Sequence, residues 1–181
     1  MDFDTQGNRS ALIMSFPQLG TDGNFSVNSA ETAVYNCIAW AMNVTNCWVD
    51  HNRIAGHWWP DGVERNLTPN ALVHAFEAVG FELTDDYAPE FGFDKVVLYK
   101  SGSCWTHASR IVSKGVEHSK FGSLWDAIHS SNVFHGTVYG DAYACMKRAK
   151  SDNHLTADAI TESAGRAQAN LQRLIALLKK P

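Results

Sequence analysis

Residues 35–41 read Tyr-Asn-Cys-Ile-Ala-Trp-Ala, and residues 104–112 read Cys-Trp-Thr-His-Ala-Ser-Arg-Ile-Val. The first run becomes apolar after a polar segment, which predicts a buried helix with Cys37 in its first turn. The second run has the composition of a half-buried strand, and His107 lies near its centre. We expect the cysteine-bearing helix to lie across a sheet and to meet His107 there.

Cys37 and His107 together predict a nucleophilic thiol. A thiol is mostly protonated at neutral pH, and it becomes nucleophilic when a helix N-terminus and an imidazole favour the thiolate. His107 would accept the thiol proton, while the Asn36 side chain and the backbone N–H of Cys37 would stabilise an oxyanion. A structural interpretation stays open, because a cysteine in an apolar helix usually serves packing.

A third catalytic residue should orient the imidazole of His107. Ser119 belongs to the strand expected over residues 116–121 and is the first candidate. Asp126 is the better hydrogen-bond acceptor, but it belongs to a short helix expected over residues 124–129. The structural alternative is that Ser119 shapes a turn and that Asp126 and His129 lie on an exposed helix face.

Composition narrows the classes of partner. The chain has 181 residues, 45% of them hydrophobic, which suits one domain with a substantial core. A net charge of −4 without a Lys/Arg cluster argues against nucleic acid. No apolar segment approaches the roughly 18 residues of a membrane span, and the first residues do not resemble a signal peptide. These features predict a cytoplasmic protein, with signal-independent secretion left open.

The four cysteines do not form a CxxC pair, so the sequence predicts neither a metal site nor a cofactor. Cys47 with His51 and His57 is the nearest alternative, but this run also contains three tryptophans and is better interpreted as an aromatic loop. The long Trp-rich loop, residues 43–66, is expected to seal the core or, alternatively, to form a wall of a substrate cleft.

The remaining pattern predicts an α+β domain over residues 1–150, with an irregular N-terminal arm and an antiparallel sheet of four to five strands. Thr68 and Pro69 mark the start of a clear helix that ends at Gly80. Residues 151–181 form a second unit, an Ala- and Leu-rich helix that packs on the domain or on a partner. The strands are expected over residues 81–83, 95–99, 104–112, 116–121 and 137–146.

The order of helix-borne Cys, strand-borne His and a polar residue on the next strand resembles papain-like hydrolases, especially the NlpC-type cell-wall peptidases. The chain also resembles a poorly characterised bacterial family. Its motifs are Asn-Cys-Ile-Ala-Trp-Ala at residues 36–41, Trp-Trp-Pro at 58–60, Thr-His-Ala-x-Arg at 106–110, and Ser-Lys-x-Gly at 119–122 followed by Asp126 and His129. The resemblance implies a papain-like fold, although NlpC peptidases have Asp-Cys-Ser where this chain has Asn-Cys-Ile.

The expected function is a cysteine hydrolase or acyltransferase that acts on an amide bond of a peptide or protein. Protease, deamidase, amidase and transglutaminase share this chemistry. One alternative is a binding module that docks a partner through the Trp-rich loop, and another is a toxin or effector with the same thiol chemistry. The C-terminal helix could also join two copies of the chain.

Overall fold

The computed structural model describes residues 1–150 of the chain. The helix expected over residues 151–181, with its suggested role in packing or oligomerisation, lies outside the described residues. None of the helices in the described part is long and apolar enough to cross a membrane. The elements are α1 (Gln6–Ser15), a 3₁₀ helix η1 (Pro17–Thr21), β1 (Ser26–Val27), α2 (Cys37–Met42), β2 (Trp48–Val49), β3 (His57–Trp58), α3 (Pro69–Glu77), β4 (Glu82–Thr84), β5 (Phe93–Ser101), β6 (Cys104–Ser113), β7 (Val116–Lys120), β8 (Asp126–Ser130) and β9 (Asp141–Ala149).

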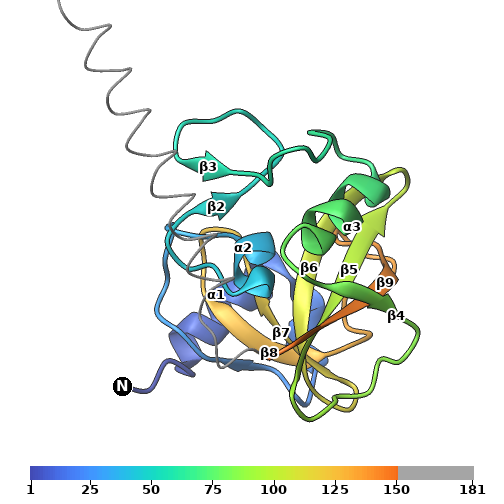
Figure 1. Ribbon diagram of the computed structural model, residues 1–181. Coiled ribbons are helices and arrows are strands. Elements are labelled where there is room, and N and C mark those ends of the chain that lie inside the picture. The colour runs from blue at the N-terminus through green and yellow to red at the C-terminus, as the bar shows by residue number, and fades with distance from the viewer. Residues whose placement is uncertain (151–181) are drawn as a thin grey trace, which may run out of the picture.

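An antiparallel sheet of seven strands organises the described residues, in the order β1-β8-β7-β6-β5-β9-β4 (Figure 1). Strands β5, β6, β7 and β8 follow one another as a meander. Gly102 and Gly115 form the first two turns with positive φ, a conformation that glycine adopts without strain. Strand β9 inserts between β5 and β4, and the short pair β2–β3 lies apart.

This architecture corrects the expected fold. The chain is mostly β, with seven strands in the sheet and three short α-helices in residues 1–150, and it is not the papain-like or NlpC-like α+β arrangement of four to five strands. The main local error is the helix expected over residues 124–129, because Asp126–Ser130 is strand β8. The N-terminal arm is not irregular throughout either, since it contains α1, whose N-cap Thr5 accepts from the Asn8 N–H at 3.2 Å through its hydroxyl.

Two apolar clusters hold the sheet. The first packs α2 and α3 on the sheet, and Ile38, Phe76, Leu98 and Ala108 belong to it. Figure 1 shows α2 and α3 on the viewer's side of the strands. The second cluster packs α1, η1 and β1 on β7 and β8 and on the turn that precedes β9; its buried members are Leu12, Leu19, Phe25, Val27, Phe121, Ala127 and Phe134.

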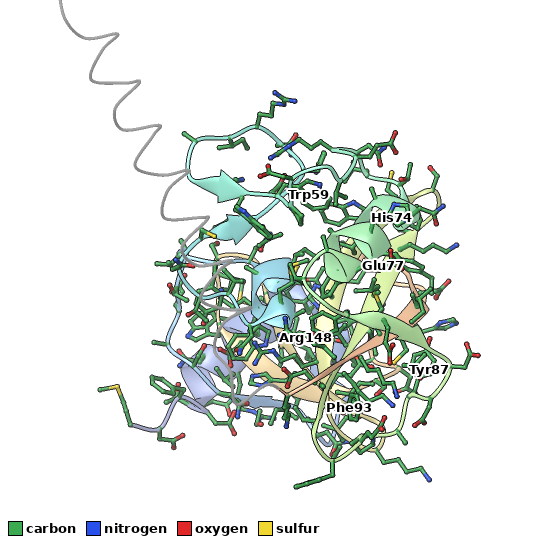
Figure 2. The ribbon with its side chains drawn as sticks, in the orientation of Figure 1. Trp59, His74, Glu77, Tyr87, Phe93 and Arg148 are labelled. Atoms are coloured by element: carbon green, nitrogen blue, oxygen red, sulfur yellow. The ribbon has the colours of Figure 1, made fainter. Side chains whose placement is uncertain are left out.

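Helix α3 confirms the Thr68–Pro69 start signal. The Thr68 hydroxyl accepts from the Ala71 N–H at 3.3 Å, and Pro69 is the first helical residue. Arg148 of β9, which is labelled in Figure 2, ties the helices to the sheet. Its guanidinium donates to the carbonyls of Val79 at 3.1 Å and Met42 at 3.3 Å. One strand residue therefore anchors the carboxyl ends of two helices.

Candidate functional site

Asn36 is the N-cap of α2 and joins this helix to β2. Its Oδ1 accepts from the N–H of Ala39 at 3.0 Å and of Val49 at 3.3 Å. Its Nδ2 donates to the Val49 carbonyl at 2.9 Å, and the residue is buried. These contacts give Asn36 a structural role, and they leave the backbone N–H of Cys37 as the other donor expected for an oxyanion.

Cys37 is the half-buried first residue of α2. Burial raises the pKa of its thiol to about 11, although the backbone N–H groups of Ala108 and Ile38 and the charge of Lys120 favour the thiolate. The resting sulfur at neutral pH is therefore a thiol, and the N-terminus of this six-residue helix does not produce the thiolate that the sequence suggested.

His107 is fully buried and points away from the face that α2 covers. Successive strand residues point to opposite faces; Ala108 packs with α2, whereas His107 contacts aromatic rings of the second cluster. Its ring stacks on Tyr139, with centroids 4.0 Å apart and planes 10° apart. The expectation that His107 lies beneath α2 is thus wrong, because the alternation of β6 turns Ala108 to that side.

Cys37 packs against the first cluster, next to Ala108 of β6. The register of β6 with β7 runs from Arg110–His118 to Ser113–Val116, so Ala108 lies just beyond the paired region. The N–H of Ala108 reaches the Cys37 sulfur there. Burial, and then the charge of Cys37, raise the pKa of Tyr139, the residue stacked on His107. The thiol thus contacts the strand residue that follows His107, and its charge acts on the ring that stacks on His107.

Ser119 lies between two buried histidines. Its Oγ is 2.8 Å from His107 Nε2 and 2.7 Å from His129 Nε2, and all three side chains are inaccessible to solvent. The other ring nitrogen of His129, Nδ1, is 3.0 Å from the Ser130 carbonyl. The Nδ1 of His107 is also buried, yet it has no hydrogen-bond partner among the described residues.

These contacts decide between the two candidates for the group next to His107. Ser119 occupies the place that the sequence suggested for it, whereas Asp126 points elsewhere and its carboxylate lies 2.7 Å from His118 Nε2. The sequence analysis missed His129, because residues 124–129 were taken for a helix with an exposed face. The signal that could have identified His129 is the alternation along β8, in which Ala127 and His129 are buried on the same face of the sheet.

Comparison with known proteins places this site within a family. The pattern of a family described as "Domain of unknown function (DUF7689)" matches residues 26–147, which include every strand of the sheet except the last two residues of β9. The chain belongs to the DUF7689 family. No curated protein matches the chain, and no solved structure does.

Lys120 explains part of the Ser-Lys-x-Gly motif of this DUF7689 domain. Its ammonium is buried and donates to the carbonyls of Thr32 at 2.8 Å, Gly122 at 2.7 Å and Leu124. Burial lowers its pKa, while the charges of Asp126 and Cys37 act in the opposite direction. Lys120 thus fixes the segment before Cys37 to the β7–β8 turn and supplies the positive charge near the thiol.

The Trp-rich loop of the DUF7689 domain belongs largely to the core. Trp59 is 1% exposed, and its ring stacks with that of Trp105 at 6.1 Å (Trp59 is labelled in Figure 2). Trp58 is buried as well. These two rings therefore pack in the core. A docking surface on this loop would have to consist of other residues, such as the exposed Ile54.

Two cavities of the DUF7689 domain are lined by residues other than Cys37. A cavity of about 390 Å³ is lined by Asp22 and Ser130 among others, and one of about 280 Å³ by Lys95 and Arg110 among others; neither is lined by Cys37. All four cysteines are free thiols. Within residues 1–150, no group of His, Cys, Asp and Glu side chains is arranged to hold a metal ion.

Proposed function

We propose that this DUF7689 domain is a cysteine hydrolase or acyltransferase that acts on an amide bond of a peptide or protein. Cys37 is the nucleophile, His107 is the general base, and Ser119 orients the imidazole. The proposal concerns the chemistry and does not depend on a papain-like fold, since the same catalytic groups occur on unrelated folds. A reducing compartment such as the cytoplasm would keep the thiol available.

The observation that carries the proposal is the buried Nδ1 of His107, which lacks a hydrogen-bond partner in the described part of the chain. An unsatisfied buried polar atom costs about 1–3 kcal/mol and therefore calls for an explanation. A thiol proton is the donor that this nitrogen lacks. The Cys37 sulfur accepts from the N–H of Ala108, the residue after His107, and its charge acts on Tyr139, whose ring stacks on His107. The proposal requires that the sulfur and Nδ1 approach each other when substrate binds, as catalytic hydrogen bonds can.

The protonation states suggest how the reaction proceeds. Burial keeps the Cys37 thiol protonated and lowers the pKa of His107 well below its ordinary value, so the resting pair is neutral. The sulfur would bond to the carbonyl carbon while its proton passes to His107 Nδ1. The C–N bond would then break as this proton moves to the leaving amine, which leaves a thioester. Water releases the acid in a hydrolase, and an amine takes the place of water in a transglutaminase.

The test is the rate of iodoacetamide labelling of each cysteine against pH, measured by peptide mass spectrometry on the full chain. Cys47 and Cys145 are internal controls, because burial raises the pKa of both thiols to about 11, as it does for Cys37. Without a base, labelling rises about tenfold per pH unit, in proportion to the thiolate. We expect Cys37 to label faster than both controls at neutral pH and with a flatter pH dependence.

The matched variant is His107→Gln, which removes the base and retains a polar side chain. We expect the labelling rate of Cys37 in this variant to fall to that of Cys47 and Cys145, and its pH dependence to become as steep as theirs. If Cys37 already follows the two controls in the unmodified chain, or if His107→Gln leaves its labelling unchanged, the proposed chemistry is wrong.

A further inference from the structure

The hydrogen bonds around Ser119 have a direction that can be followed atom by atom. The Ser130 carbonyl can only accept, so His129 Nδ1 carries a proton. In a neutral His129, Nε2 is then an acceptor, and the Ser119 hydroxyl must donate its single proton to it at 2.7 Å. The Ser119 oxygen has only lone pairs left for His107, so His107 Nε2 is the donor in the 2.8 Å contact.

We infer that His129 is a positioning residue that acts through Ser119 to hold His107 in its Nε2–H tautomer, with Nδ1 as a lone-pair acceptor. This inference rests on the proposed function only for its consequence, which is that Nδ1 is the nitrogen able to receive the Cys37 proton. The tautomer itself follows from three hydrogen bonds, the last of which is accepted by the backbone carbonyl of Ser130. His129 touches neither the thiol nor a substrate in this scheme.

Packing holds the imidazole of His107 in place, with Nε2 beside Ser119. The ring of His107 lies nearly parallel to that of Tyr139, with centroids 4.0 Å apart, and the edge of Phe134 faces it at 6.3 Å. Phe134 also contacts the ring of His129, with centroids 4.8 Å apart. The side chains of His107, Ser119, His129 and Phe134 are all inaccessible to solvent. Solvent therefore cannot replace Ser119 as the partner of Nε2. The direction of the hydrogen bonds is set by the Ser130 carbonyl, which can only accept.

The neutrality that this inference requires agrees with the surroundings of the two rings. Two ionisable groups act on His129: Asp22, which raises its pKa, and His118, on β7 opposite Ile128 of β8, which lowers it. Burial is the dominant influence on both histidines, and it lowers the pKa of His129 to about 4 and that of His107 well below its ordinary value. Both rings are thus neutral at pH 7, where each has one donor and one acceptor nitrogen.

The experiment is the assignment of histidine tautomers at pH 7 by long-range ¹H–¹⁵N NMR on the full chain with ¹⁵N-labelled histidine. We expect the Nδ1–H tautomer for His129 and the Nε2–H tautomer for His107. In His129→Phe, the Ser119 hydroxyl loses its acceptor and can either donate to His107 Nε2 or accept from it, so the population of the Nε2–H tautomer of His107 should fall. Phe134→Leu disturbs the packing of both rings but leaves the hydrogen bonds, and it should leave the tautomer of His107 unchanged.

An Nδ1–H tautomer or a charged His107 in the unmodified chain would overturn the inference, and this measurement does not depend on any variant folding. A population of the Nε2–H tautomer of His107 that stays unchanged in His129→Phe would overturn it too. If that variant does not fold, Ser119→Ala serves instead. It removes the hydroxyl that links His107 to His129, so the Nε2–H tautomer of His107 should lose its preference.

The iodoacetamide rates separate this inference from the proposed function. If the tautomers are as stated and His129→Phe slows Cys37 labelling to the level of His107→Gln, both stand. If the tautomers are as stated but Cys37 labelling is the same in His107→Gln, the positioning role of His129 stands and the thiol chemistry fails.

Discussion

Glu117 is a buried carboxyl group that accepts hydrogen bonds from Tyr99 Oη and Ser109 Oγ, and burial raises its pKa. We expect Tyr99→Phe to lower the free energy of unfolding by about 1.5–3 kcal/mol, the range for hydrogen bonds to charged groups. Tyr143→Phe is the matched control, because the Tyr143 hydroxyl donates to the neutral Pro69 carbonyl at 2.9 Å. That variant should cost about 1 kcal/mol.

Urea unfolding at neutral pH measures both variants. An equal or smaller loss in Tyr99→Phe would mean that the carboxyl group of Glu117 is protonated in the folded protein, so that it offers Tyr99 no more than a neutral acceptor does. The variant Glu117→Gln would then be expected to unfold at nearly the same urea concentration as the unmodified chain.

Residue types alone point to part of the site. Cys37, His107 and Ser119 could be named from the sequence because each has a distinct chemistry and lies in a recognisable helix or strand. The role of His129 could not, because its partner Ser119 is brought to it by the pairing of β7 with β8, in which Glu117 and not Ser119 is the register partner. The contact of Asn36 with Val49 could not be predicted for a similar reason, since it depends on where β2 lies.

At the scale of the element, α2 has only six residues, so side chains from the sheet must hold it. Arg110 of β6 donates to the Trp40 carbonyl and to Asn43 Oδ1 at 3.0 Å, and its guanidinium lies 4.0 Å from the centre of the Trp40 ring. We expect Arg110→Gln to lower the free energy of unfolding by about 2 kcal/mol, because a charged hydrogen-bonding group and a cation–π contact are lost.

Arg53→Gln is the control for this change, because Arg53 is exposed. It should alter the free energy of unfolding by less than about 0.5 kcal/mol. Thermal or urea unfolding gives both values, and an Arg110→Gln variant as stable as Arg53→Gln would show that α2 does not depend on this anchor.

The elements that the sequence predicted well are those with strong local signals. Strands β5, β6 and β7 are separated by glycine turns, and α3 begins with Thr68 and Pro69. Strand β8 was missed because its polar residues face inward on both sides, Asp126 toward His118 and His129 toward Ser119, which resembles neither a helix nor a half-exposed strand. Strand β9 begins at Asp141 and not at residue 137 as expected. The residue before it must be a glycine, because a Cβ atom at Gly140 would lie 2.0 Å from the Lys100 carbonyl oxygen.

For the whole molecule, the buried histidines predict a loss of stability in acid. Burial lowers the pKa of His129 from 6.5 to about 4, so the unfolded chain binds its proton at a higher pH than the folded one. The stability that this histidine contributes is complete above about pH 6.5 and is lost between about pH 6.5 and 4, at about 1.4 kcal/mol per pH unit and about 3 kcal/mol in all. His107 acts in the same direction, and the raised pKa of Glu117 acts in the opposite one.

Urea unfolding across this window, in the unmodified chain and in His129→Gln, isolates the contribution of His129. We expect a shallower loss of stability below pH 6.5 in the variant, which has no imidazole to protonate. Parallel curves for the two proteins would mean that His129 titrates alike in the folded and unfolded chains.

The position of β9 between β5 and β4 also determines when the sheet can be completed during translation. Strand β5 pairs with β9 from Phe93–Ala149 to Lys100–Asp141, and β4 joins the sheet through β9 alone. While residues 141–149 are still in the ribosome, the nascent chain carries a long unpaired strand edge and a β4 segment with nowhere to dock. A chain released early would offer that edge to other chains, so premature termination should yield aggregates rather than a smaller folded domain.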